Sequence, residues 1–278
     1  MRTSYDETSR AFDALAPGYD SLYGPGENAV MAWMRRESLQ LLRSTFAEGS
    51  HLLEIGCGTG DEAVALARSD RTVVATDVSP RMVSMARAKA AAAGVEDRVT
   101  AVALPAAGVG LLRPTRPFDG AYASFGALNC EPDLAGLSTS LARLVAPGSA
   151  FICSVMPPCC PFEIAWFLLH GRPRNALRRF RDHWQIADIG QDREGARLSV
   201  STRFVSLRDL RTALEPDFAF RRVISLGLLL PPTYLDPVFR RHRRLFSTLE
   251  QLERILRARW PWRTWGDHIA AVFRRQPS

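Results

Sequence analysis

The sequence of 278 residues lacks several features that would place it in a special class. No uncharged apolar run approaches the roughly 18–20 residues of a membrane-spanning helix. Internal repeats and low-complexity tracts are absent, which argues against a repeat or fibrous architecture. The first twenty residues are polar and acidic, without the apolar centre of a signal peptide. We therefore expect a cytoplasmic protein without a membrane span.

Cysteine is scarce and is not spaced for metal binding. The five cysteines are an odd number, and none shows the Cys-x-x-Cys spacing that is common in zinc sites. Cys159 and Cys160 are adjacent, which leaves soft-metal or redox chemistry as an alternative. We expect reduced thiols that fill small spaces, and no metal.

Lysine is nearly absent, since Lys89 is the only lysine among 36 basic residues. The net charge of +7 is uneven, because residues 1–169 carry −4 and residues 170–278 carry +11. A basic C-terminal part suits a nucleic acid, an anionic lipid surface or an acidic small molecule. The arginines recur among apolar residues at helical spacing, so a solvated exterior is the alternative that we favour.

Apolar strands and helices alternate along most of the chain. Their strands are apolar without alternation, which is typical of a parallel sheet that is covered on both faces. The sequence therefore predicts an α/β fold with a doubly wound, mostly parallel, seven-stranded sheet of the Rossmann-like type. We expect strands at 51–55, 72–76, 98–104, 119–125, 150–156, 219–230 and 269–275.

Two stretches interrupt this alternation and divide the chain into parts. Residues 1–50 read as an N-terminal helical cap, and residues 51–156 as the α/β core. Residues 157–205 are too long for an ordinary connection, so we expect an inserted helical lid with an arginine-rich helix at 175–184. Residues 206–278 resume the core and contain a second helical insertion at about 235–260.

A glycine-rich turn joins the first strand to the following helix. Gly56, Gly58 and Gly60 alternate, so the third glycine comes one residue earlier than in the dinucleotide pattern Gly-x-Gly-x-x-Gly. Asp61 and Glu62 follow at once, and two carboxylates at a helix N-terminus would repel a pyrophosphate. The turn is therefore better suited to a ligand that carries positive charge.

A second acid stands at the end of the second strand. Asp77 is placed to accept hydrogen bonds from the hydroxyls of a ribose. Its alternative role is to cap the helix that begins at Pro80, but Ser79 already suits that role.

These motifs together resemble the class I S-adenosylmethionine-dependent methyltransferases, in their small-molecule and quinone branch. The resemblance rests on Glu54-x-Gly-x-Gly-x-Gly, on Asp77, and on the stretches PFDGAYASFGALNCEPDL (117–134) and LARLVAPGSAFICSVM (141–156). The opening AFDALAPGYD adds to it. It covers residues 10–156 and, more weakly, the last two strands.

The resemblance implies that S-adenosyl-L-methionine is the cofactor. The glycines would wrap its methionyl part, Glu54 would support the amino group, and Asp77 would bind the ribose. Tyr19 would close over the cofactor, with plain core packing as its alternative. One departure stands after strand three, where the family often has Gly-Asp and this chain has no acid. The implied cofactor-binding residues are Tyr19, Glu54, Gly56, Cys57, Gly58, Gly60, Asp77, Val78, Met82, Pro105, Ala106, Ser124, Phe125 and Asn129.

The acceptor side of the site is less defined by the sequence. If the last strand is antiparallel, as the resemblance implies, its start lies at the cofactor edge and brings His268 there as a candidate base. His170 is a second candidate, with His183 as a further alternative. An apolar lid would bind the acceptor, unless its aromatic residues form only the core of the insertion; they are Phe162, Trp166, Phe167 and Tyr234.

Three functions remain open from the sequence. The first is methyl transfer to a hydrophobic small molecule in metabolism. The second is RNA methylation by the basic C-terminal half, although the chain has no recognised RNA-binding module and no base-flipping signature of the Asn-Pro-Pro-Tyr type. The third is a cofactor-binding protein of this fold without methyl transfer, because fold alone does not determine function.

Overall fold

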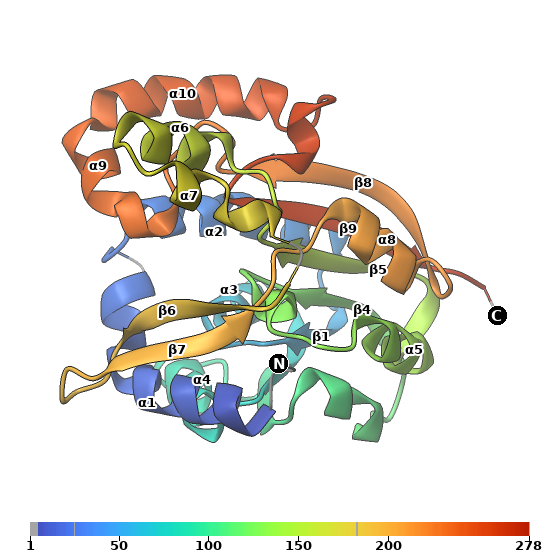
Figure 1. Cartoon of the computed structure of the whole chain (residues 1–278). Helices are drawn as coiled ribbons and strands as arrows, with labels where there is room; N and C mark the ends of the chain where they lie inside the picture. The colour runs from blue at the N-terminus through green and yellow to red at the C-terminus, as the bar shows by residue number, and fades with distance from the viewer. Residues whose placement is uncertain (1–4, 25, 182, 278) are drawn as a thin grey trace.

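A central sheet of seven strands organises the computed structural model, which describes residues 5–24, 26–181 and 183–277 (Figure 1). The strand order is β3-β2-β1-β4-β5-β9-β8. The first five are parallel, and β9 is antiparallel to both of its neighbours. The strands are β1 (His51–Ile55), β2 (Thr72–Asp77), β3 (Val99–Ala103), β4 (Phe118–Ala123), β5 (Val145–Val155), β8 (Phe218–Leu226) and β9 (His268–Arg275). The predicted sheet and its antiparallel last strand are confirmed.

Helices cover both faces of this sheet, as its apolar strands require. One buried cluster lies under α2, α3, α4 and the second insertion, and the other lies under α5 and α8. The helices of the core and of the N-terminal part are α1 (Tyr5–Tyr23), α2 (Ala29–Thr45), α3 (Asp61–Ala67), α4 (Pro80–Ala92), α5 (Leu134–Leu144) and α8 (Leu207–Leu214), with short 3-10 turns η1 (Ala106–Leu111) and η2 (Ala127–Asn129).

The first insertion, residues 157–205, is only half helical, so the prediction of a helical lid is wrong for its second half. It contains α6 (Pro161–Leu169), α7 (Pro173–Ala176) and η3 (Arg178–Phe180), and then the hairpin of β6 (Gln185–Gln191) and β7 (Arg197–Thr202). The alternation Leu198, Val200, Thr202 and the turn at Asp192–Gly195 are the hairpin signals that were missed. The hairpin packs on α1, since Gly190 lies against Leu15 and Leu22.

The predicted arginine-rich helix at 175–184 is also wrong. Arg178 and Arg179 both bind the buried carboxylate of Glu163. The α-helix α7 ends at Ala176, and the two arginines lie in the 3-10 turn η3 that follows. Consecutive residues of an α-helix point in different directions, so an α-helix would not direct both arginines at one carboxylate.

The second insertion is helical as predicted. It comprises η4 (Thr233–Leu235), α9 (Asp236–Arg241), α10 (Arg243–Leu256) and η5 (Trp262–Thr264). Figure 1 shows α9 and α10 along the top of the molecule, at the end opposite to α1. The rings of Phe162 and Phe246 lie 6.0 Å apart and join the two insertions.

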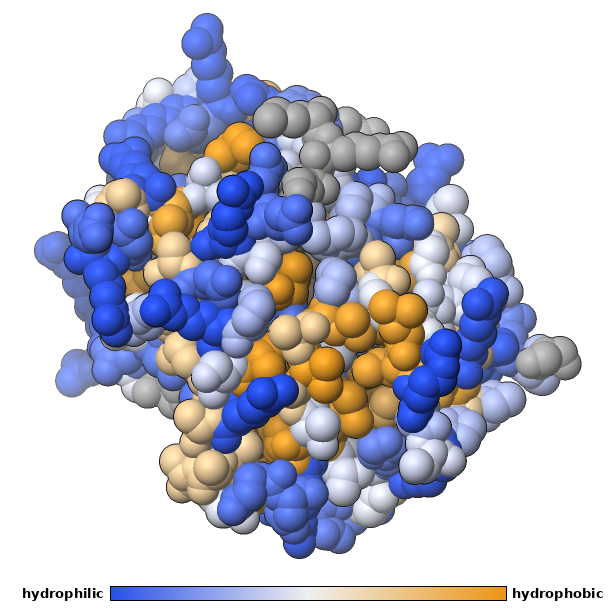
Figure 2. Space-filling view, turned by 90° about the horizontal axis from the view of Figure 1, so that it is seen from below, coloured by the Kyte–Doolittle hydropathy of each residue, from blue (hydrophilic) through white to orange (hydrophobic). Residues whose placement is uncertain are grey.

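One face of the molecule has an apolar middle. Figure 2 shows apolar side chains gathered in the middle of the face seen from below, with hydrophilic residues around them.

Along residues 5–24, 26–181 and 183–277, no helix is at once long and apolar enough to cross a bilayer. Within the same ranges, no group of His, Cys, Asp and Glu side chains is arranged to hold a metal ion. All five cysteines are free thiols.

A buried ion pair holds α10 against α2. The Glu37 carboxylate, with its side chain 1% exposed, accepts hydrogen bonds from Arg254 at 2.9 Å and from Arg257 at 2.6 Å. Replacing Glu37 by alanine removes the partner of both arginines, although each retains some contact with water. We expect Glu37→Ala to lower the free energy of unfolding by about 2 kcal/mol in urea titrations. Glu48→Ala removes an exposed carboxylate from the turn after α2 and is the control, which should change it by less than about 0.5 kcal/mol. Equal effects of the two variants would contradict this role.

Candidate cofactor and acceptor site

The glycine turn after β1 is held to the end of β2 by its own backbone. The N–H groups of Gly56 and Cys57 both donate to the carbonyl oxygen of Thr76, at 2.8 and 2.9 Å. Gly56, Gly58 and Gly60 all have positive φ, between 53° and 84°. Because this region favours glycine, the three positions explain the spacing seen in the sequence.

The three glycines have different neighbours. A Cβ at Gly56 would collide with Ala127, and a Cβ at Gly60 would lie 2.8 Å from that of Ala86. These two glycines are therefore required by the packing of the chain itself. At Gly58 a Cβ would make only ordinary contacts, the nearest with the Tyr19 hydroxyl 3.8 Å away, so the packing of the chain does not itself exclude a side chain here.

Glu54 is the feature of this site that most clearly requires a ligand. Its side chain, at the end of β1, is completely buried, and its two carboxylate oxygens have only the Tyr122 hydroxyl beside them, without a hydrogen bond of good geometry. Burial, and then the negative charge of Glu62, raise the pKa of Glu54 well above its ordinary value. Buried polar groups normally have partners. A ligand with an ammonium group, such as the amino-acid end of S-adenosylmethionine, would satisfy this carboxylate.

Asp77 is buried and directed at the glycine turn. One carboxylate oxygen accepts from Gly58 N at 2.8 Å and the other from Ser79 N at 2.9 Å. The side chain of Ser79 accepts from Met82 N and caps α4, so Asp77 is not the helix cap. Burial raises the pKa of Asp77 to about 6, despite the two backbone hydrogen bonds. Each oxygen retains a lone pair for a ribose hydroxyl.

Helix α1 is fastened over the glycine turn. The Thr59 hydroxyl donates to Asp20 at 2.7 Å, and Lys89 forms an ion pair with Asp20 at 3.0 Å. Ser9 donates to the carbonyl oxygen of Val78. The single lysine of the chain thus holds the helix that carries Tyr19. The sequence analysis assigned no role to Asp20 or Lys89, although the Tyr-Asp pair and the single lysine were visible signals.

The carboxylates after the glycines have partners within the chain. Arg35, buried on α2, pairs with Asp61 at 3.1 Å and with Glu62 at 2.7 Å. The inference that these two acids favour a cationic ligand is therefore wrong, and Glu54 takes over that role. Arg35 was missed, although an arginine on the apolar stripe of a helix is a signal of a buried partner.

A second group of side chains meets at the carboxyl ends of β4 and β5. The rings of Phe125 and His268 lie 5.9 Å apart, edge to face. A Cβ at Gly126 would lie 3.4 Å from Met156 Cε and 4.0 Å from His268 Nε2. Phe125 has a positive φ of 46°, an unfavourable conformation that is often found at functional sites. Ligands of such sheets bind at this edge.

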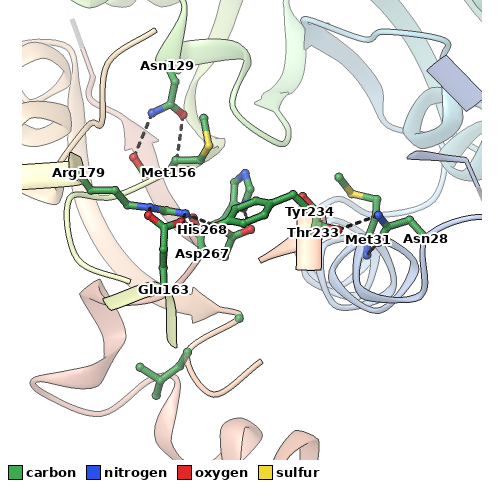
Figure 3. Close-up of polar contacts among 12 residues, drawn as sticks. Asn28, Met31, Asn129, Met156, Glu163, Arg179, Thr233, Tyr234, Asp267 and His268 are labelled. Atoms are coloured by element: carbon green, nitrogen blue, oxygen red, sulfur yellow. Dashed lines mark hydrogen bonds and ion pairs between the residues drawn. The ribbon is translucent and has the colours of Figure 1, made fainter. Parts of the chain in front are cut away.

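Asn129 is brought to this edge but is not free to bind a ligand. Its amide nitrogen donates to the carbonyl oxygens of Met156 and Arg203, and its side-chain oxygen accepts from Met156 N (Figure 3). Asn129 therefore clamps the segments after β5 and β7 together, and its expected contact with the cofactor stays a prediction.

The remaining expected residues lie at different distances from the glycine turn. Val78, at the turn after β2, is partly buried, and Met82 is buried in the first turn of α4. Pro105 and Ala106 follow β3 and are partly buried, while Ser124 is buried after β4. Cys57 is buried in the turn, where burial raises the pKa of its thiol well above the ordinary value. These positions agree with a cofactor along the ends of β1 to β4, and their contacts stay predictions.

The three candidate histidines differ in burial and in position. His268 is buried at the edge, whereas the exposed His170 bonds its own helix through the carbonyl oxygen of Trp166 at 2.7 Å. His183 is exposed as well. The structure brings His268, and not His170, beside Phe125 and Met156.

The aromatic residues of the insertions pack mainly on each other. Phe162 stacks on Trp166 at 6.5 Å and contacts Phe246, while Phe167 lies under Arg178. The half-exposed Tyr234 donates its hydroxyl to Glu163 at 2.9 Å. These contacts match the alternative of a core formed by the insertions themselves. A direct role in acceptor binding stays a prediction.

Comparison with known proteins agrees with this geometry. Residues 52–148 match the family model of a methyltransferase domain. A demethylmenaquinone methyltransferase of Symbiobacterium thermophilum is 30% identical over 153 residues, which cover 51% of this chain and 56% of that enzyme. The match therefore spans little more than half of that relative.

Two solved structures share the whole fold. The CcbJ methyltransferase from Streptomyces caelestis has a TM-score of 0.65 and 17% identity, over 98% of this chain and 100% of that one. The [4+2]-cyclase SpnF also has a TM-score of 0.65 and 17% identity, over 100% and 97%. These similarities concern the fold alone, which is seen in a cyclase as well as in a methyltransferase.

The bare backbone at Gly58 gives a direct test of cofactor binding. Gly58→Ala should weaken binding of S-adenosylhomocysteine at least tenfold in isothermal titration, because the new methyl group would stand between the backbone of the turn and the ligand proposed to contact it. Gly94→Ala is a matched control, since Gly94 also has positive φ and no atom lies within 4 Å of a Cβ there. Both variants carry a similar backbone strain of about 1 kcal/mol. Unchanged binding by Gly58→Ala would contradict the assigned site.

The pKa of Asp77 predicts how binding depends on pH. Below about 6 the carboxyl becomes neutral and is a weaker acceptor for ribose hydroxyls. Glu54, with its raised pKa, acts in the same direction, because an ammonium ligand favours the charged carboxylate. We expect the affinity for S-adenosylhomocysteine to be about tenfold weaker at pH 5 than at pH 7. Isothermal titration across this range is the measurement, and stronger binding at pH 5 would show that these carboxylates do not hold the ligand.

The matched domain, the seven-stranded sheet and the cradle formed by Glu54, Gly58 and Asp77 all lead to the same family. Residues 52–148 are a methyltransferase domain whose fold and relatives are those of the class I S-adenosylmethionine-dependent enzymes, and its cofactor is S-adenosyl-L-methionine.

Proposed function

We propose that this protein transfers a methyl group from S-adenosyl-L-methionine to an apolar small molecule of metabolism. The observation that carries the proposal is the buried carboxylate of Glu54, which has no cationic partner, beside a glycine turn with positive φ at Gly58. A relative is named a demethylmenaquinone methyltransferase, which supports a quinol-like acceptor.

The chain's own residues would position the reactants. Glu54 would bind the amino group, the turn at Gly58 would contact the methionyl part, and Asp77 would accept from the ribose. When bound, S-adenosylmethionine supplies an electrophilic methyl group. Helix α1, fastened through Asp20 and Lys89, covers this part of the site and excludes water. Positioning and exclusion of water are the main requirements for such a displacement.

The acceptor would enter between the core and the insertions. Phe125 and Met156 present apolar groups at the carboxyl edge of the sheet. Tyr234 of the second insertion binds Glu163 of the first, and Arg179 links this carboxylate to Asp267 near that edge. An apolar acceptor fits such an edge better than a charged one, because burying an unpaired charge is costly.

RNA methylation is the second candidate, and its basis is the charge of +11 in residues 170–278. Several of these arginines are already used inside the protein. Arg179 pairs with Glu163 and Asp267, and Arg254 and Arg257 pair with Glu37. On the face seen from below, Figure 2 shows apolar residues at the middle and no continuous basic groove of the kind that follows a phosphate backbone. These observations favour the small molecule.

A labelling experiment separates the candidates. The protein is incubated with S-adenosylmethionine that carries a deuterated methyl group, together with an apolar cell extract, demethylmenaquinol, or total RNA. We expect the label in the extract or the quinol, with one S-adenosylhomocysteine formed for each product. Gly58→Ala should lose this activity, and Gly94→Ala should retain it. Label in RNA alone would support the second candidate, and cofactor binding without label in any arm would support the non-transferring alternative.

A further inference from the structure

A buried chain of charged groups runs from the first insertion to the start of β9 (Figure 3). Glu163, on α6 and 1% exposed, accepts from Arg179 at 3.1 and 2.8 Å. Arg179, 4% exposed, donates to the carboxylate of Asp267 at 2.7 Å and to its carbonyl oxygen at 3.1 Å. The second carboxylate oxygen of Asp267 lies 3.2 Å from His268 Nδ1.

The charges in this chain balance when His268 is neutral. Glu163 and Asp267 are each 3% exposed or less, and Arg178 and Arg179 provide two positive charges beside them. Burial acts to raise the pKa of Asp267, but the hydrogen bonds from His268 and Arg179, together with the positive charge of Arg179, outweigh it and hold the pKa well below the ordinary value. Asp267 is therefore a charged hydrogen-bond acceptor.

A charged acceptor determines which nitrogen of the imidazole carries the proton. A carboxylate can only accept, so Nδ1 of His268 is the donor and Nε2 has the free lone pair. Nε2 lies near Gly126, next to Met156 and the Phe125 ring, and makes no hydrogen bond among the described residues. The lone pair is thus at the edge where the acceptor would bind.

We propose that His268 is the proton acceptor of the reaction and that Asp267 and Arg179 are its positioning residues. This inference rests on the proposed methyl transfer. The O–H or N–H proton of the acceptor moves to His268 Nε2 while the acceptor's lone pair forms the bond to the methyl carbon. The electrons of the broken C–S bond remain on sulfur, which becomes neutral. Asp267 stabilises the imidazolium, which later releases its proton to water.

The arrangement also gives the first insertion a role in the reaction. Arg179 and Glu163 belong to this insertion, whereas Asp267 and His268 belong to the core. Tyr234 of the second insertion donates to the same Glu163. The carboxylate beside His268 is therefore held in place by a chain of contacts that includes both insertions.

The tautomer can be measured without knowing the acceptor. In ¹⁵N NMR of the whole protein with labelled histidine, at pH 8, we expect the His268 signal to show a protonated Nδ1 and an unprotonated Nε2. His268→Gln assigns the signal by its loss. Asp267→Asn should shift the proton toward Nε2, and Asp267→Glu should restore the original pattern. A wild-type signal with the proton on Nε2 would overturn the proposal.

A matched control separates positioning from stability. Glu37→Gln also alters a buried, arginine-paired carboxylate, but it lies on α2 and does not contact a histidine. It should leave the His268 signal unchanged. If Asp267→Asn does not fold, Arg179→Lys provides the comparison. It should shift the imidazole proton of His268 toward Nε2 to a smaller extent.

Activity gives the second readout, as label from the deuterated methyl group in the apolar extract. His268→Gln should lower the rate about 100-fold or more, while the affinity for S-adenosylhomocysteine stays within twofold. Unchanged activity of this variant would refute the role of His268 and leave the proposed function intact. If the wild-type protein does not bind S-adenosylhomocysteine, the proposed function is refuted instead. The NMR experiment would then still decide which nitrogen of His268 carries the proton.

Discussion

The structure depends first on the hydrogen bonds between the turn after β1 and the end of β2. Gly56 and Cys57 donate to Thr76, and Asp77 accepts from Gly58. These contacts place two carboxylates, Glu54 and Asp77, on either side of a backbone with little side-chain bulk. Without this link the acids would belong to two separate strand ends. With it they lie at one turn, where we propose that they bind the ammonium group and the sugar of the cofactor.

The same principle of internal pairing explains the unusual charge distribution. The C-terminal part carries many arginines, yet its buried ones serve to join segments of the chain. Arg179 joins the first insertion to β9, while Arg254 and Arg257 join α10 to α2. A buried carboxylate lies at each junction, since an arginine away from water needs a partner. A net charge computed from the sequence therefore overstates the charge that is available to a polyanion.

Much of the cofactor side could be predicted, because its signals are local. The alternation of strands and helices, the glycine spacing and the position of Asp77 each lie within a short window of sequence. The insertion was predicted less well. The hairpin at 185–202 has only a short apolar alternation, at Leu198 and Val200, between polar residues. In the arginine-rich segment, two adjacent arginines bind Glu163, a contact that the sequence does not reveal.

The sequence by itself determined the sheet, the glycine turn and the acid at the end of the second strand, because backbone conformation and apolar periodicity are properties of neighbouring residues. Only the tertiary structure decided the partners of the charged groups. Arg179 meets Asp267 across 88 positions, and Tyr234 meets Glu163 across 71. It likewise showed that Asn129 is a clamp and that Arg35 neutralises Asp61 and Glu62. Such pairings join residues that are distant in the sequence. They depend on how the folded segments pack in space, and a local sequence pattern does not reveal this packing.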